Sequence, residues 1–85
     1  MWNDRLRFAE RVESDWKALS EDERAALRPA LEAIDEDPIV GAPLFHPLRG
    51  FWSYRVNELR ILYRISPEAR VVVVLKIGRV TEAKP

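Results

Sequence analysis

The fold of this chain of 85 residues is decided by residues 48–65, LRGFWSYRVNELRILYRI, and by the apolar run VVVVLKI at 71–77. Two runs rich in aromatic and β-branched residues, 51–56 and 59–65, flank the dipeptide Asn57-Glu58. Such runs are typical of β-strands, and Asn tolerates the positive φ that a two-residue hairpin loop requires. The pattern therefore predicts a β-hairpin followed by a third strand.

A two-residue loop at Asn57-Glu58 also predicts the pairing of the two strands, because successive pairs lie on opposite faces of a sheet. One face then consists of aromatic and β-branched pairs, namely Val56 with Leu59, Tyr54 with Ile61 and Trp52 with Tyr63. The other face carries Arg55 with Arg60, Ser53 with Leu62 and Phe51 with Arg64. We expect the first face to pack against helices.

Arg55 and Arg60 are directly opposed in this register, and like charges in such a pair destabilise a sheet by roughly 0.2–1 kcal/mol. Guanidinium groups bind phosphate oxygens through paired hydrogen bonds, so the two arginines indicate an anion site. The alternative is an ordinary solvated sheet face, neutralised by an acid such as Glu58 or Glu82.

The same reasoning extends the cationic face to the third strand. If the next turn spans residues 66–70, Ile65 pairs with Val71 and Lys76 falls directly beside Arg60. A row of three cations across three strands follows from this register.

The N-terminal half is predicted to be helical. Residues 5–8 alternate basic and apolar side chains, which is compatible with a short first strand. A helical stripe follows, with apolar residues spaced four, four and three apart at Phe8, Val12, Trp16 and Leu19. Ser20 and Glu23 form a capping-box signature that begins a second helix, in which Pro29 is expected to cause a kink or a break.

Residues 35–50 contain three of the six prolines and two of the three glycines, which indicates a connecting loop. The resulting fold class is α+β, one domain over residues 1–85. An N-terminal helical hairpin, with or without a short strand before it, packs on one face of an antiparallel sheet of three to four strands.

Composition narrows the functional classes. The chain has no cysteine and one histidine, so no usual set of metal ligands exists and neither a metal nor a cofactor is expected. Net charge is zero, so an anion site has to be local. The single histidine, His46, lies in the predicted loop and is a weak candidate for a general base. The absence of an apolar run of membrane-spanning length or a signal peptide predicts a cytoplasmic protein without membrane contact.

Residues 48–79 resemble the bacterial RelE/ParE toxin superfamily. The shared motifs are L-x-G at Leu48, then W-x-x-R-V-x-x-x-R-[IV]-[IL]-Y from Trp52, then V-x-[VL]-L-x-[IV]-G from Val72. The resemblance implies a compact RelE-like fold and the toxin role in a type II toxin–antitoxin system. RelE-like members cut mRNA in the ribosomal A site, whereas ParE-like members poison DNA gyrase without a nuclease reaction.

We therefore expect a RelE-like, ribosome-dependent mRNA endonuclease, also called an mRNA interferase. The resemblance implies that basic residues on the sheet activate the ribose 2′-hydroxyl and stabilise the transition state. Carried onto matching positions, it implies catalytic roles for Arg55, Arg60 and Arg79. Substrate-binding roles are expected for Lys76, Arg64 and Arg49.

Two departures from the family pattern keep an alternative open, so the resemblance does not decide whether the chain is an enzyme. Arg79-Val80 stands where the family more often has His or Lys and then a functional Arg, and the chain ends at Pro85 without a tyrosine-bearing tail. The alternative is a non-nuclease member of the same fold, either a ParE-like gyrase inhibitor or an inactive homologue that acts through protein binding.

The expected partners follow from the same resemblance. A cognate antitoxin should lay an extended or helical segment with acidic side chains across the basic sheet face and the helical hairpin. The ribosome with its mRNA, or gyrase in the alternative, is the expected target. A homodimer of the isolated chain that buries the arginine face is also compatible with the sequence.

Overall fold

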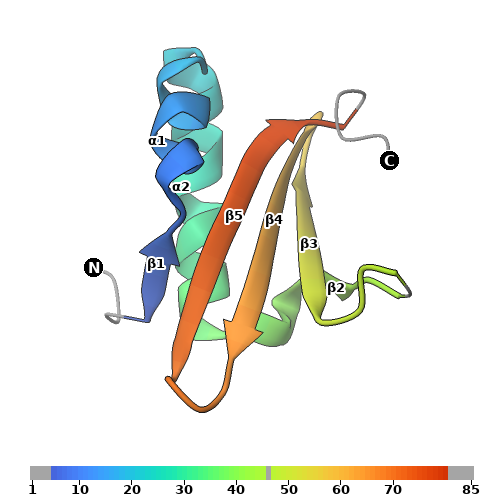
Figure 1. The fold of residues 1–85 in the computed structure, drawn as a ribbon. Helices are drawn as coiled ribbons and strands as arrows, with labels where there is room; N and C mark the ends of the chain where they lie inside the picture. The colour runs from blue at the N-terminus through green and yellow to red at the C-terminus, as the bar shows by residue number, and fades with distance from the viewer. Residues whose placement is uncertain (1–4, 46, 81–85) are drawn as a thin grey trace.

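The computed structural model describes residues 5–45 and 47–80, and Figure 1 shows the order of their helices and strands. The elements are β1 (Leu6–Phe8), α1 (Glu10–Lys17), α2 (Glu21–Glu36), the short 3₁₀ helix η1 (Pro38–Val40), β2 (Ala42–Pro43), β3 (Phe51–Val56), β4 (Leu59–Ser66) and β5 (Val71–Arg79). This is the predicted α+β organisation, with a helical hairpin ahead of the main strands.

The strands form one mixed sheet in the order β1-β5-β4-β3-β2, in which β1 is parallel to β5 and the other neighbours are antiparallel. The described residues thus contain five strands rather than the three to four antiparallel strands expected. The edge strands β1 and β2 have three and two residues; β1 is the short first strand with which residues 5–8 are compatible, and β2 was not predicted. A segment of two residues carries too little alternation to be recognised, and Pro43 is typical of an edge position or a loop.

The β3–β4 hairpin has the predicted register. Asn57 takes the left-handed conformation with φ of 56°, and Val56 pairs with Leu59 across the loop. At the far end, Trp52 pairs with Tyr63 and their rings stack with centroids 6.4 Å apart. Because a slip of one residue would exchange the two faces, this turn decides which side chains meet the helices.

The predicted register between β4 and β5 is wrong by one residue at the turn. Ile65 pairs with Val72 instead of Val71, because Ser66 extends β4 by one residue. The turn is therefore shorter than expected, and Arg70 closes it in the left-handed conformation with φ of 57°.

A β-bulge between the pairs of Leu62 and Tyr63 shifts the register by a further residue, so Lys76 lies opposite Leu62 and Gly78 lies opposite Arg60. The predicted row with Lys76 directly beside Arg60 is therefore wrong. A shift of one residue alone would have placed Lys76 on the opposite face of the sheet from Arg60. The two shifts together return it to the face of Arg60, where it pairs with Leu62, two residues along β4 from Arg60.

The predicted capping box begins α2. The Ser20 hydroxyl accepts the backbone N–H of Glu23 at 3.1 Å, and the Glu23 carboxylate accepts the backbone N–H of Ser20 at 2.9 Å. The helix continues through Pro29, which does not divide it. Pro29 and Ala25 are both exposed, so the Ala25 carbonyl that loses its helical bond can face water. Within the described ranges, neither helix combines the length and apolar character that crossing a bilayer requires.

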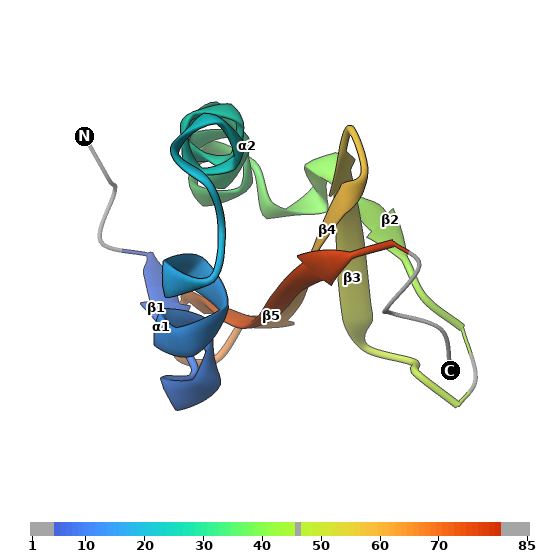
Figure 2. The same cartoon turned by 90° about the horizontal axis from the view of Figure 1, so that it is seen from above.

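The core lies between the helical hairpin and one face of the sheet (Figure 2). Side chains from α2, β4 and β5 are almost completely excluded from solvent here: Leu27, Ile34, Ile61, Tyr63, Val72 and Val74. Each such apolar burial stabilises the fold by about 1.5–3 kcal/mol. The predicted apolar face of the hairpin is thus the face that takes the helices.

Tyr63 fastens the segment after α2 to the sheet. Its buried hydroxyl donates to the Pro38 carbonyl at 2.7 Å and accepts the Gly41 N–H at 3.1 Å. Burial is the main cause that raises the pKa of this hydroxyl above its ordinary range. Gly41 permits the close approach, because a Cβ there would lie 2.5 Å from the Tyr63 oxygen and 2.7 Å from the Ser53 carbonyl oxygen.

We expect Tyr63→Phe to lower the free energy of unfolding by about 1–3 kcal/mol, since it leaves a carbonyl and an N–H without a partner. Urea denaturation followed by tryptophan fluorescence measures this change. Tyr54→Phe is the matched control, because the Tyr54 hydroxyl has no hydrogen bond among the described residues and its loss should change stability little. Equal losses from both substitutions would contradict the role assigned to the Tyr63 hydroxyl.

Candidate functional site

Strand alternation gathers cationic side chains on the sheet face that the helices leave uncovered (Figure 2). We call this surface the open face. The register assigns to it residues from three neighbouring strands: Phe51, Ser53, Arg55, Arg60, Leu62, Arg64, Val73, Lys76 and Gly78. The open face is therefore basic at several points and apolar between them.

Arg55 and Arg60 lie directly opposite each other on the open face, in the predicted register. Arg55 is exposed, and its Nε donates to the Asn57 carbonyl at 2.9 Å, which orients its guanidinium beside the hairpin loop. Arg60 is half-buried, and its Nε is shielded from solvent without a hydrogen-bond partner in the described part of the chain. Native structures rarely leave a shielded donor unpaired, so a ligand that reorients Arg60 would relieve a cost already present.

No carboxylate in the described ranges forms an ion pair with Arg55 or Arg60. The ion pairs found there are Arg11 with Asp15, Lys17 with Glu13, and Arg79 with Glu23. Glu58 is exposed in the hairpin loop and makes no ion pair with either arginine, while Glu82 lies outside the described residues. Within the described structure, the positive charge of the arginine pair is therefore available to an external anion.

Arg79 does not join the open face. It pairs with the core residue Leu59 and therefore points to the helix side, where its Nη1 lies 2.5 Å from a carboxylate oxygen of Glu23. The fold thus separates Arg79 from Arg55 and Arg60, with which the sequence grouped it.

Glu23 has a second role that sequence reasoning missed. Its one carboxylate caps the start of α2 and holds the end of β5 through Arg79. The capping-box spacing predicted only the first contact. Arg79 lies 56 residues further along the chain, so no local pattern could have predicted the second.

The three predicted substrate-binding residues lie at different places around the open face. Lys76 is half-buried and lies diagonal to Arg60, close to the arginine pair. Arg64 is exposed and pairs with Phe51 at the opposite end of β3, and Arg49 is exposed in the loop beyond that end. The fold therefore brings Lys76 to the arginine pair and places Arg64 and Arg49 at a second cationic corner.

The open face can bind and stabilise negative charge. Its polar groups are guanidinium, ammonium and the Ser53 hydroxyl, with no imidazole or carboxylate among its residues. His46, the weak candidate for a general base, lies outside the described residues. Nowhere in 5–45 and 47–80 do three or more potential metal-ligating side chains gather at one point. The arrangement suits phosphate binding and transition-state charge stabilisation.

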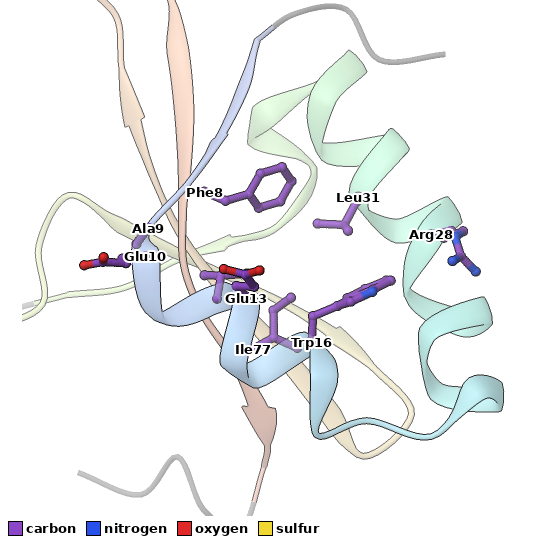
Figure 3. Close-up of a pocket in the computed structure, with 9 residues that line it drawn as sticks. Phe8, Ala9, Glu10, Glu13, Trp16, Arg28, Leu31 and Ile77 are labelled. Carbon is purple, nitrogen blue, oxygen red and sulfur yellow. The ribbon is translucent and has the colours of Figure 1, made fainter.

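A separate apolar groove of about 460 Å³ lies on the helix side of the molecule (Figure 3). Its lining comes from β1, α1, α2 and β5: Phe8, Ala9, Glu10, Val12, Glu13, Trp16, Arg28, Leu31 and Ile77. Trp16 packs against the core, as predicted, and the Arg28 guanidinium lies 5.6 Å from its ring centre. The polar side chains are few and do not converge, so the groove does not resemble a catalytic site.

The profile of the ParE toxin family of type II toxin–antitoxin systems, parDE, matches residues 6–83. The chain belongs to this family, and with it to the RelE/ParE superfamily of type II toxins. The predicted resemblance and the toxin class are thereby confirmed. A search of curated proteins returned no match.

Solved structures support the same family and fold. A chain of the toxin–antitoxin complex RelBE2 from Mycobacterium tuberculosis is 33% identical, with a TM-score of 0.79 and coverage of 87% of this chain and 94% of that one. The intact Escherichia coli RelBE complex gives 25% identity, a TM-score of 0.77 and coverage of 88% and 94%. The YoeB/ParE toxin from Agrobacterium tumefaciens shares the fold at 20% identity, with a TM-score of 0.74 and coverage of 88% and 96%.

We expect Glu23→Gln to destabilise the protein at neutral pH, with a difference from wild type that shrinks in acid. The hydrogen bond from Arg79, followed by that from the Ser20 backbone, lowers the pKa of Glu23 below its ordinary value of 4.5. A depressed folded-state pKa contributes stability above the unfolded pKa, and this contribution is lost as pH falls through the folded pKa.

Thermal unfolding followed by circular dichroism across the acid range measures this difference. Glu32→Gln is the control, because Glu32 is exposed on the same helix and has no ion pair in the described ranges. A difference between Glu23→Gln and wild type that stayed constant down to strongly acid pH would rule out the linkage.

Proposed function

We propose that this chain acts as a RelE-like, ribosome-dependent mRNA endonuclease. The observation that carries the proposal is the directly opposed pair Arg55 and Arg60 on the open face, with no carboxylate paired to either in the described ranges. The repulsion costs roughly 0.2–1 kcal/mol. A phosphate between the guanidinium groups replaces it with charge-assisted hydrogen bonds, so a phosphodiester of RNA is the ligand that we assign.

In the proposed reaction, the ribose 2′-oxygen attacks the adjacent phosphorus and the bond from phosphorus to the following 5′-oxygen breaks. The 2′-hydroxyl proton ends on the leaving oxygen, which balances the step. Negative charge builds up on the non-bridging oxygens, where Arg55 and Arg60 stabilise it and Lys76 adds a third positive charge. We assign proton transfer to the substrate, water or ribosome, because the open face carries neither imidazole nor carboxylate.

The partner that we propose is a cognate antitoxin that covers the open face. Relatives of known structure were solved as toxin–antitoxin complexes, including RelBE2 of Mycobacterium tuberculosis and RelBE of Escherichia coli. Acidic side chains on an antitoxin segment would neutralise the arginine pair, and apolar ones would cover Leu62 and Val73.

Gyrase inhibition is the second candidate function. Two observations favour it: the matching family is that of ParE toxins, and Arg79 is turned to Glu23 on the helix side. The open face then holds fewer of the expected catalytic cations and would act as a protein-binding surface. An inactive homologue that only binds an antitoxin is the limiting form of this alternative.

Under the proposed function, Arg60→Ala and Arg55→Ala should each reduce A-site mRNA cleavage by roughly 10²–10³-fold and relieve growth inhibition, since each removes a donor to developing charge. Inducible expression in cells with mapping of mRNA ends measures this. Lys17→Ala is the matched control, because it removes one exposed positive charge from α1 and should leave toxicity unchanged.

Each possible result decides between the candidates. Full cleavage by Arg60→Ala would contradict the catalytic assignment. A DNA-damage response with intact mRNA would replace it with gyrase inhibition, and normal growth on expression of the wild-type chain would indicate an inactive homologue.

The antitoxin proposal makes a prediction of its own. An adjacent reading frame should encode a small acidic DNA-binding protein, and its co-expression should abolish toxicity and protect the open face from hydrogen exchange. Failure of the neighbouring product to bind the purified chain would contradict this part of the proposal.

A further inference from the structure

We propose that Phe45, in the loop between β2 and β3, stacks on a nucleobase of the RNA whose phosphate lies at the arginine pair. This inference rests on the proposed function and adds a residue that contacts a base instead of a phosphate. Phe45 is 80% exposed, the highest value among the large hydrophobic side chains of the described residues. Base stacking on an aromatic ring is a common source of affinity for single-stranded nucleic acid.

Backbone hydrogen bonds tie the chain on both sides of Phe45 to the start of β3. The Leu44 N–H donates to the Phe51 carbonyl at 2.9 Å, which continues the pairing of β2 with β3 up to the residue before Phe45. The Leu48 N–H donates to the Phe45 carbonyl at 2.7 Å, and the Phe51 N–H donates to the Leu48 carbonyl at 3.1 Å. A ring presented from a hydrogen-bonded turn loses less conformational freedom on binding than one on a free chain.

The charge around Phe45 favours RNA as the occupant. No Asp or Glu occurs between residues 38 and 57, and Arg49 is exposed in the same loop. Arg64, also exposed, pairs with Phe51 at the strand end where the loop closes. The backbone at Phe45 therefore lies near the strand end that carries the second cationic corner, and an exposed aromatic ring near cations that form no ion pair in the described ranges complements stacked bases on a phosphate backbone.

The direction of the loop agrees with this occupant. Figure 2 shows the loop projecting away from α2, the helix on the other side of the sheet. Phe51 and Arg55 are separated by four residues along β3, which corresponds to about 13 Å at a rise of about 3.3 Å per residue. The stacked base therefore belongs to a nucleotide removed from the cleaved phosphate, so Phe45 should affect binding of RNA more than the chemical step.

The test uses the purified full chain and a fluorescein-labelled single-stranded 2′-O-methyl RNA, which lacks the nucleophilic hydroxyl. Fluorescence anisotropy should show roughly 5- to 150-fold weaker binding for Phe45→Ala, the range expected when one stacked base is lost. Phe45→Trp should bind at least as well as wild type, whereas Phe45→Leu should bind as weakly as Phe45→Ala. Circular dichroism confirms that each variant is folded.

Two further measurements separate stacking from charge. On an oligonucleotide of the same length with abasic linkers, Phe45→Ala and wild type should bind equally, because no base is present to stack. The slope of log affinity against log salt should be unchanged in Phe45→Ala, whereas Arg55→Ala should lower its magnitude by about 0.7, the value for one phosphate contact with a single strand.

The inference is overturned if Phe45→Ala binds the RNA as tightly as wild type, if its binding defect persists on the abasic strand, or if Phe45→Leu binds the RNA as tightly as wild type. A defect confined to antitoxin or gyrase binding would also overturn it and make the loop a protein contact. The proposed function is judged separately by A-site cleavage. Cleavage without a Phe45 effect on binding rejects the inference alone, and a Phe45 effect without cleavage rejects the nuclease proposal alone.

Discussion

The pairing of β3 with β4 across Asn57-Glu58 is the constraint on which both surfaces of the sheet depend. A slip of one residue would turn Ile61 and Tyr63 toward water and carry Arg60 into the core. Each displaced apolar side chain would forfeit about 1.5–3 kcal/mol, and an unpaired buried charge would cost several kcal/mol more. The left-handed conformation of Asn57 therefore favours this register through the turn, and burial of the apolar face favours the same register through packing.

The open face retains groups whose requirements the described structure does not meet. Arg55 and Arg60 repel each other, and the Arg60 Nε is shielded without a hydrogen-bond partner in the described ranges. A sheet selected for stability alone would place neutral or oppositely charged pairs at these positions. Locally unfavourable groups that persist in a well-packed fold often mark functional surfaces, which is consistent with an open face that binds RNA or an antitoxin.

Under the proposed function, the distribution of charge would help a chain with no net charge to bind a polyanion. Most of the acids lie between residues 10 and 37, in and around the helical hairpin, whereas the cations Arg55, Arg60, Arg64 and Lys76 lie on the open face. Such a separation orients an approaching nucleic acid toward the sheet without a large overall attraction. Arg79 is the exception to this separation, because its ion pair with Glu23 holds one cation on the helix side of the sheet.

The sequence by itself determined the hairpin, its register, the start of α2 and the opposition of Arg55 and Arg60, because each depends on residues a few positions apart. Turn chemistry, strand alternation and the capping box are all local. Only the tertiary structure decided the edge strand β2, the parallel pairing of β1 with β5, the bulge that moves Lys76 away from the side of Arg60, and the contact of Arg79 with Glu23. These features depend on how distant segments meet: an extra residue in β5 reassigns every later pair, and a contact across 56 residues leaves no periodic signal in the chain.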